Sequence, residues 1–403
     1  MELFWLEHKK LWRKKIVKIC VLLCFVYYVI FGSILLFQWF GFGSSDDYTS
    51  AFGNNFDGYT VIKDSQEYAL SFGGELTDET LQQIVSDYQQ MEADGMEEEL
   101  EKTDWQIVNS WLGTLYPELR DTSNYKTMIS YVDPDKLTGF YERRQQVLDE
   151  FLEVSGQVGA EKEFLHQIER KVEKPFHYEW VEGWSTLLGS MVADLGVVMA
   201  LFLGIVLSSL FAGEWHDNTS TLVLTTRNGW GKIALAKILT GLAFTVELFA
   251  LLAVSSVISQ LFFMGTAGWD MPIQNIKLIA VAPMNMLQAE IYEYAFVLLG
   301  AIGFAGIVMF ISAAVKNNVL TLLLSLAVVY GPMMIAEYLP YEMQKALDLI
   351  PLVGSSTDIF RTNTFRILGK LIWSPYLLIT IPVLIGILCM PFAIKSWSRR
   401  MKA

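Results

Sequence analysis

Two acidic residues lie inside long apolar stretches of the sequence, where a charged side chain is costly and usually has a function. Glu247 falls near the middle of one stretch, and Asp194 lies about two helical turns into another. At such a depth a carboxylate can contact a cation or a substrate amine. It can also face inward, protonated and hydrogen-bonded to a neighbouring helix, and for Asp194 this structural role is the favoured interpretation. Both are candidate pathway residues.

The short motifs of the common enzyme classes are absent from the sequence. No glycine-rich loop ends in Gly-Lys-Ser or Gly-Lys-Thr, so the chain has no such loop to cradle the phosphates of ATP. The four histidines are scattered and form no metal-ligand cluster. We therefore expect no enzyme activity, no metal site and no cofactor bound by this chain. If the protein moves a solute uphill, the energy comes from an ion gradient or from another subunit.

Hydrophobic residues make up 53% of the chain. They gather in blocks long enough for a helix to cross a hydrocarbon core roughly 30 Å thick, without the polar stripe of a soluble helix. The fold class expected is therefore an all-α polytopic membrane protein with six transmembrane helices. The predicted spans are residues 19–40, 187–212, 234–262, 295–315, 319–337 and 374–394.

Lysines and arginines in the short connecting segments set the predicted orientation. The N-terminal segment 1–18, the loop 213–233 and the tail 395–403 are basic, and Lys316 lies in the turn after the fourth span. With six crossings all of these fall on the cytoplasmic side, as do both termini. Basic residues in the outer segment 338–373 count against this orientation, although acidic residues balance them there. The expected location is the cell membrane, plasma or inner.

An acidic region separates the first two predicted spans. Residues 44–185 carry 30 aspartates and glutamates against 11 lysines and arginines, a net charge near −19. The whole segment, 41–186, is long enough for a core of its own. Apolar residues at helical spacing in 140–152 and 164–172 predict helices there. We expect a mainly helical extracytoplasmic domain, whose acidity either attracts a cationic partner or, as we favour, keeps its surface soluble.

Two smaller outer segments complete the predicted topology. The loop 263–294 joins the third and fourth spans, and the segment 338–373 joins the fifth and sixth. Tyr178, Trp180 and Trp184 precede the second span and fit an aromatic belt at the outer membrane interface.

The loop after the second span combines an acid, a threonine, leucines and basic residues. From Phe211 it reads FAGEWHDNTSTLVLTTRNGWGKIALAK. Thr219 can hydrogen-bond locally, and Leu222 and Leu224 can anchor in an apolar groove of a partner. Lysines at the end of the segment can meet lipid phosphates or acidic residues of that partner. A basic loop that only anchors the helix ends in lipid is the simpler alternative.

This segment resembles the loop between the second and third spans of ABC-2-type permeases. In that family a Glu is followed by Gly-Thr, a leucine-rich pair, a turn with a basic residue, and a Lys that opens the third span. Glu214, Thr219, Val223 with Leu224, and Lys237 keep this order and spacing.

The segment departs from the family pattern at two positions. Asn218 stands where the family often has Gly, and Arg227 where it often has Pro. The turn from Thr226 to Lys232 is closer to a Gram-positive variant of the pattern. The candidate coupling residues are Glu214, Thr219, Leu222, Leu224, Arg227, Lys232 and Lys237.

The resemblance implies a permease subunit of a bacterial ATP-binding-cassette exporter. In such exporters this loop is a short coupling helix lying in a groove of an ATPase subunit. The expected partners are two ATPase subunits, which bind ATP and magnesium, a second copy of this permease or a related one, and membrane lipids, but no nucleic acid. The large domain after the first span resembles the layout of sodium-exporter-like and antimicrobial-peptide-exporter-like members. The segment 338–373 resembles the re-entrant helices of the family.

Two other functions remain open from the sequence. One is an ion-coupled secondary transporter that uses Glu247. The other is a membrane receptor or scaffold that acts through its acidic outer domain. The sequence leaves the substrate undecided among peptide, lipid, drug and cation.

Overall fold

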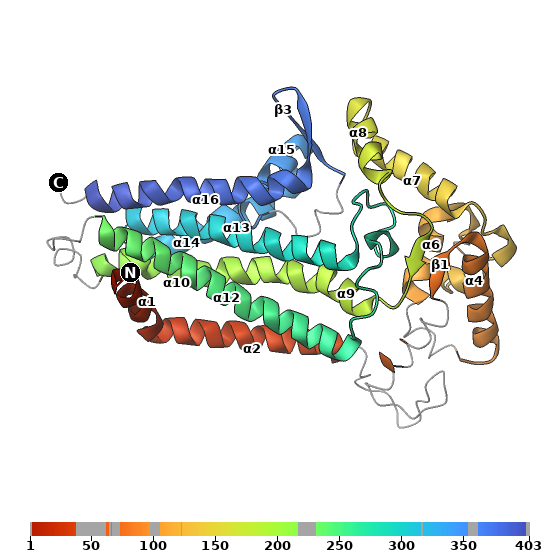
Figure 1. Ribbon diagram of the computed structural model, residues 1–403, viewed down its shortest axis with the longest axis horizontal. Coiled ribbons are helices and arrows are strands. Elements are labelled where there is room, and N and C mark those ends of the chain that lie inside the picture. Colours follow the sequence, from red (N-terminus) through yellow and green to blue (C-terminus); the bar gives the residue numbers. More distant parts are fainter. Residues whose placement is uncertain are drawn as a thin grey trace.

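A computed structural model of the chain shows a mostly helical protein (Figure 1). Long apolar helices form a bundle, and shorter helices form a smaller domain at one end of it. The coarse expectation of a mostly helical protein with several candidate membrane spans is thereby confirmed. The structure describes residues 2–37, 62–63, 66, 73–96, 105–121, 123–216, 231–315, 317–353 and 362–399.

Five helices in this described part are long and apolar enough to cross a membrane. The first is continuous through α9 (Glu182–Thr186), a π-helical turn (Leu187–Met191) and α10 (Val192–His216). The others are α12 (Lys232–Met264), α13 (Met286–Ala314), α14 (Asn318–Ile335) with a 3-10 turn (Ala336–Tyr338), and α16 (Ser374–Arg399).

The N-terminal part of the chain forms two helices, α1 (Glu2–Arg13) and α2 (Lys15–Phe37). The second overlaps the predicted span at 19–40, whose last residues lie outside the described part. α2 contacts α10 and α12, and its opposite side exposes apolar residues such as Leu22 and Leu23. A helix that is apolar on both sides fits a position between the bundle and lipid. Its buried side consists of Val17, Cys20, Cys24 and Tyr28.

α13 begins well before the predicted start of the fourth span at residue 295. Asn285 Oδ1 accepts a hydrogen bond from the Gln288 backbone N–H at 2.8 Å, and Gln288 Oε1 accepts one from the Asn285 N–H at 3.2 Å. This reciprocal capping box starts the helix. This stretch carries two acids, Glu290 and Glu293, and the fold buries both.

α13 and α16 pack with their backbones in close contact. Gly303 and Gly306 of α13 face α16, and a methyl group on either would overlap the backbone of Pro382 or Gly386. Small residues at a crossing let two membrane helices approach closely and gain van der Waals contact. The glycines therefore fix how near these two helices can lie.

The domain between α2 and α9 is called here the inserted domain, and apart from residues 62–63 and 66 its described part begins at residue 73. Its first strand, β1 (Gly74–Leu76), pairs antiparallel with its last strand, β2 (Phe176–Tyr178). The helices are α4 (Asp78–Ala93), α6 (Trp105–Leu115), α7 (Phe140–Val154) and α8 (Ala160–Glu169), with 3-10 turns at Pro117–Leu119, Met128–Ser130 and Pro134–Lys136. The helices expected from the apolar spacing are confirmed as α7 and α8.

Aromatic rings fill the core of the inserted domain. Phe140 meets Trp111, Tyr141 and Phe176 edge to face, a favourable arrangement for ring quadrupoles. Asp78, at the start of α4, accepts hydrogen bonds from the backbone N–H groups of residues 139 and 140 at 2.7 and 2.9 Å. One carboxylate thus caps the first turn of α7 and ties two helices together.

The expected all-α fold needs a correction, because the described part also contains two small antiparallel sheets. The second sheet is a hairpin of β3 (Thr364–Ile367) and β4 (Lys370–Trp373). Leu368 and Gly369 form its turn with φ of 50° and 80°, the left-handed geometry that matches the strand twist. The expected re-entrant helical segment 338–373 is therefore only partly helical where described, at α15 (Tyr341–Leu347).

The expected aromatic belt before the second span is also wrong. Trp180 and Trp184 are buried, and their indole N–H groups donate to backbone carbonyls directly after α12, from Trp180 to Met264 at 3.1 Å and from Trp184 to Ala267 at 3.0 Å. The sequence could not distinguish a lipid-facing Trp from one that seals a contact between two protein segments.

We predict that Gly306→Ala destabilises the bundle, because the added methyl group overlaps the backbone of α16. Overpacking of this kind costs about 1–3 kcal/mol. Gly196→Ala in α10 is the matched control, since a methyl group there meets no atom within 4 Å and alanine is the better helix former. Thermal unfolding of the purified chain in detergent measures both. Equal melting temperatures for the two variants would contradict the close crossing.

Candidate functional site

The end of the bundle where α10 stops and α12 starts is called here the loop end. The α1 helix and the last turns of α16 lie at the same end (Figure 1). Of the predicted coupling segment, the structure describes Glu214, Lys232 and Lys237. The other four candidates, Thr219, Leu222, Leu224 and Arg227, lie outside the described residues.

Glu214 and Lys237 form a buried ion pair across the base of the predicted loop. The distance from Lys237 Nζ to Glu214 Oε1 is 2.9 Å, and the two side chains are 2% and 4% exposed. Lys237 Nζ also donates to the carbonyl of Leu210 at 3.1 Å. A buried pair is retained only where further partners satisfy its remaining hydrogen-bonding groups.

Helix α1 supplies those partners. Lys237 Nζ donates to Glu7 Oε2 at 2.9 Å, and Lys10 Nζ donates to Glu214 Oε1 at 2.5 Å. Lys14, just beyond the helix, donates to Ser209 Oγ at 3.1 Å. The loop-end charge cluster consists of Glu7, Lys10, Lys14, Glu214 and Lys237, which line a small cavity.

The spacing of the α1 residues explains how one short helix reaches both sides of the loop. Glu7 and Lys10 are three residues apart on α1, so they share one face of the helix, and Lys14 follows directly after its end. The same helix exposes Trp5 and Leu6. The cluster therefore joins α1, α10 and α12 by charge at the point where the predicted loop leaves the bundle.

Glu247 does not lie in the interior of the bundle. Its side chain is 42% exposed, and its Oε1 lies 3.1 Å from His8 Nε2. Trp12 Nε1 donates to its Oε2, also at 3.1 Å. Both partners belong to α1, so the carboxylate faces this helix. A role for Glu247 in a transport pathway stays a prediction.

Asp194, like Glu247, forms a hydrogen bond with one of the two N-terminal helices. Its Oδ1 accepts a hydrogen bond from the hydroxyl of Tyr27, on α2, at 3.1 Å. A hydrogen bond to a neighbouring helix is the structural role that the sequence favours for Asp194. Its role in a pathway also stays a prediction.

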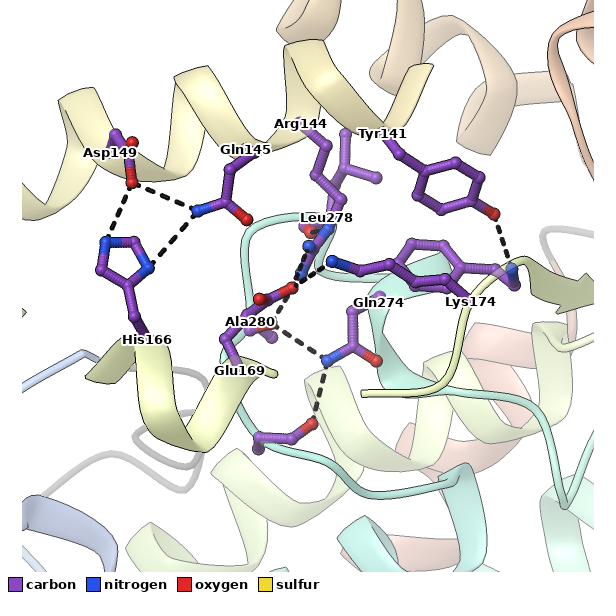
Figure 2. Close-up of polar contacts among 12 residues, drawn as sticks. Tyr141, Arg144, Gln145, Asp149, His166, Glu169, Lys174, Gln274, Leu278 and Ala280 are labelled. Atoms are coloured by element: carbon purple, nitrogen blue, oxygen red, sulfur yellow. Dashed lines mark hydrogen bonds and ion pairs between the residues drawn. The ribbon is translucent and has the colours of Figure 1, made fainter. Parts of the chain in front are cut away.

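At the opposite end of the bundle, one arginine connects the inserted domain to the loop between α12 and α13 (Figure 2). Arg144 is completely buried. Its Nε donates to the carbonyl of Leu278 at 2.7 Å, and its Nη2 to that of Ala280 at 3.2 Å. Its Nη1 donates to Glu169 Oε1 at 2.6 Å. The planar guanidinium thus holds two backbone carbonyls and one carboxylate at once.

The acidic partner of this arginine is itself stabilised by a second cation. Lys174 Nζ lies 2.9 Å from Glu169 Oε1. Burial acts to raise the pKa of Glu169, but hydrogen bonds from Lys174 and Arg144 outweigh it and hold the pKa below its usual range. The carboxylate is therefore ionised at neutral pH, and its charge balances the buried guanidinium.

Amide side chains fix the rest of this contact. Gln274 donates to the carbonyls of residues 280 and 282 at 3.0 and 2.9 Å (Figure 2). The Asn275 side chain donates to the carbonyl of His177 at 2.6 Å, and the Asn275 backbone carbonyl accepts from the Trp111 indole at 3.0 Å. The predicted outer loop is thus a buried, hydrogen-bonded structure pressed against the inserted domain.

A cavity of about 490 Å³ opens beside this contact, between residues 171–177 and 270–288. Its walls carry charges of both signs, from Lys171 and Glu173 among others. Gln274 Oε1 lies in the wall without a hydrogen-bond partner among the described residues. Such walls suit a polar solute better than an apolar one. No group of three or more His, Cys, Asp or Glu in the described part is arranged to hold a metal ion.

Sequence reasoning identified both members of the central ion pair but missed the helix that completes it. The N-terminal segment was read as a basic tail. Its amphipathic spacing was the available signal, since Leu3, Phe4 and Leu11 sit among charged residues at helical intervals. Arg144 gave no such signal, because its partners lie at residues 169, 278 and 280.

Comparison with known proteins gives no further guide. No protein-family model, no curated protein and no solved structure matches the chain.

We predict that Lys237→Met destabilises the loop end by about 3–5 kcal/mol, because it removes the cation that contacts both the buried Glu214 carboxylate and the partly buried Glu7. Lys232→Met, on the same helix but exposed, should change stability by less than about 0.5 kcal/mol. Adding Glu214→Gln to Lys237→Met should recover part of the loss. Thermal unfolding in detergent measures all three variants, and an additive double variant would rule out the ion pair.

Neighbouring arginines provide a second test. Arg144→Met removes the buried connection and should cost about 3–5 kcal/mol. Arg143→Met removes a surface pair with Glu118, whose side chain is 52% exposed, and should cost at most about 1 kcal/mol. Thermal unfolding and limited proteolysis of the inserted domain report the difference. Similar losses from both variants would contradict the assigned role of Arg144.

Proposed function

We propose that the chain is the membrane-spanning permease subunit of an ATP-binding-cassette exporter. It would move a substrate outward across the membrane with ATP hydrolysed by a separate subunit. Two features support the proposal: the helices suited to membrane crossing, and the resemblance of residues 211–237 to a coupling loop. The single observation that carries it is the buried contact of Glu214 with Lys237 at the base of that loop.

The charge cluster gives the proposed coupling a physical route. A partner that displaces the loop acts on α10 and α12 together, because the ion pair joins them, and on α1 through Glu7 and Lys10. The displacement also reaches α13. Ser312 Oγ accepts from the backbone N–H groups of Phe211 and Ala212, both at 3.1 Å, and donates to the carbonyl of residue 208 at 2.7 Å. Contiguous packed and hydrogen-bonded elements of this kind can transmit a change between sites.

In the proposed assembly two ATPase subunits bind ATP and magnesium, and this chain holds neither. A second permease copy, or a related permease, would complete the pathway between the two halves. ATP binding would close the ATPase pair and move the loop. The spans would then rock and open the pathway outward. No residue of this chain takes a catalytic part.

The secondary transporter and the receptor remain the alternatives. A secondary transporter that uses Glu247 is expected to lose transport in Glu247→Gln and to respond to the ion gradient. A receptor or scaffold is expected to lose function on deletion of the inserted domain, and to tolerate changes at the loop end. The first experiment below distinguishes both from the exporter.

We expect gentle purification of the tagged chain from its native membranes to bring with it a soluble subunit that carries a Gly-x-x-x-x-Gly-Lys-Ser/Thr loop. Thr219→Ala and Glu214→Ala should weaken this association, because they alter the loop and its base. Glu247→Gln is the matched control, since its side chain contacts α1 away from the loop. Mass spectrometry of the purified complexes gives the result. The exporter proposal is abandoned if no such ATPase is recovered under conditions that preserve other membrane complexes.

A further inference from the structure

One buried carboxylate has no part in either contact described above. Glu290 lies in the first turns of α13, at the end of the bundle that carries the inserted domain. Only 4% of the residue is exposed. Its carboxyl group interacts with the hydroxyl of Tyr294, one turn further along α13, and has no other hydrogen-bond partner among the described residues. The buried cations Arg144 and Lys237 each contact a carboxylate, whereas Glu290 forms no ion pair among the described residues, and this needs a physical account.

The groups around Glu290 present oxygen atoms. The hydroxyls of Tyr294, on α13, and Tyr28, on α2, are close enough to interact with it electrostatically. Tyr28 donates its proton to the carbonyl of Met191 at 2.5 Å, so its oxygen offers lone pairs to anything nearby. Tyr294 shares a hydrogen bond of 2.5 Å with Ser256 Oγ of α12.

Further acidic groups lie on the elements that pack here. Glu293 is completely buried one turn along α13, and carboxylates three residues apart on a helix repel each other when both are ionised. Asp194 of α10 interacts with the same Tyr28 hydroxyl. α9, which also contacts α13, carries Glu182. The titratable groups facing this region are thus acids, tyrosines and the Cys24 thiol of α2.

An ionised carboxylate in such surroundings has a large unfavourable solvation energy, because it has lost water without gaining a positive partner. Two changes remove that cost. A proton can convert the carboxylate to a neutral acid, or a small metal cation can bind between it and the neighbouring hydroxyl oxygens. Hard monovalent cations take oxygen ligands of this kind, and a buried acid in a membrane protein is a recurrent site for both.

We propose that the Glu290 carboxylate binds a small cation, either a proton or an alkali-metal ion, in a site completed by the hydroxyl oxygens of Tyr28 and Tyr294. The site brings together α2 and α13, with α12 joined through Ser256. It lies close to the start of α13, directly after the loop that Arg144 holds. Binding and release at Glu290 therefore change the charge at a junction of three helices. The proposal does not depend on an ATPase partner.

Dicyclohexylcarbodiimide is the probe for the site, because this apolar reagent adds to protonated carboxyl groups in membrane proteins and leaves carboxylates alone. The full chain is purified in detergent, treated over a range of pH in choline chloride, and digested for mass spectrometry. We expect modification of Glu290, faster at lower pH, and its loss in Glu290→Gln. Glu293→Gln, one turn away, is the matched control and should leave the modification in place.

Salt distinguishes the two cations. Replacing choline by sodium or potassium at constant pH should slow the modification if the site takes an alkali-metal ion, and should leave it unchanged if the site takes a proton. Either result supports the proposal. Modification that moves to Glu293, or that responds to neither pH nor salt, overturns it.

A second measurement covers the case in which the reagent cannot reach the site. In choline chloride, raising the pH removes the proton and leaves an unpaired buried charge, so the wild-type melting temperature should fall relative to that of Glu290→Gln. If sodium or potassium binds, it should raise the wild-type melting temperature and leave that of the variant unchanged. Parallel curves for the two proteins in both pH and salt would overturn the proposal independently of labelling.

Discussion

A charge that the fold takes out of water must meet an opposite charge or enough hydrogen-bond partners, and this constraint governs both ends of the bundle. At the loop end, Lys237 is held by Glu214, by Glu7 and by a backbone carbonyl. At the other end, Arg144 is held by Glu169 and by two backbone carbonyls. In each case the charge is satisfied only when segments distant in sequence come together.

The same constraint explains why parts of the chain that look like mere connections are ordered in the structure. Helix α1 buries little of its apolar surface, since Leu11 is its only buried residue in the described part and Trp12 packs partly buried against Phe244. Its charged face adds a second connection to the bundle, through Glu7 and Lys10. The loop after α12 likewise offers its carbonyls to Arg144. Polar contacts therefore act together with apolar packing in setting the positions of these two segments.

Much of the architecture follows from the spacing of apolar residues along the sequence. The rest depends on contacts between residues far apart in the sequence. Long apolar blocks predict the candidate spans because lipid requires a continuous apolar helix, and apolar spacing predicts α7 and α8. α13 extends back to Met286, beyond the predicted span, because the burial of Glu290 and Glu293 depends on the fold. The β3–β4 hairpin was missed because Leu-Gly is a weak turn signal beside Asn-Gly.

Of the candidate site, too, the sequence predicts one part, and the other part depends on the fold. Glu214 and Lys237 were identified from the order of residues in the loop, but their mutual contact depends on where α10 ends and α12 begins. Glu7 and Lys10 could not be assigned, because more than 200 residues separate them from their partners. Glu247 was chosen for its depth in an apolar stretch. Its actual neighbours, His8 and Trp12, are set by the fold of α1 across that stretch.

The pairing of β1 with β2 has a consequence for how the protein can change over evolutionary time. Gly74 and Tyr178 are register partners, so the chain enters and leaves that part of the inserted domain through two strands about 5 Å apart. A segment with adjacent ends can be lengthened, shortened or replaced by recombination without altering the path of the membrane helices. What restricts such exchange is the contact with the loop before α13, because any replacement must offer that loop donors equivalent to Arg144 and Trp111. The inserted domain can therefore vary in length and sequence while the membrane helices of the same chain stay unchanged.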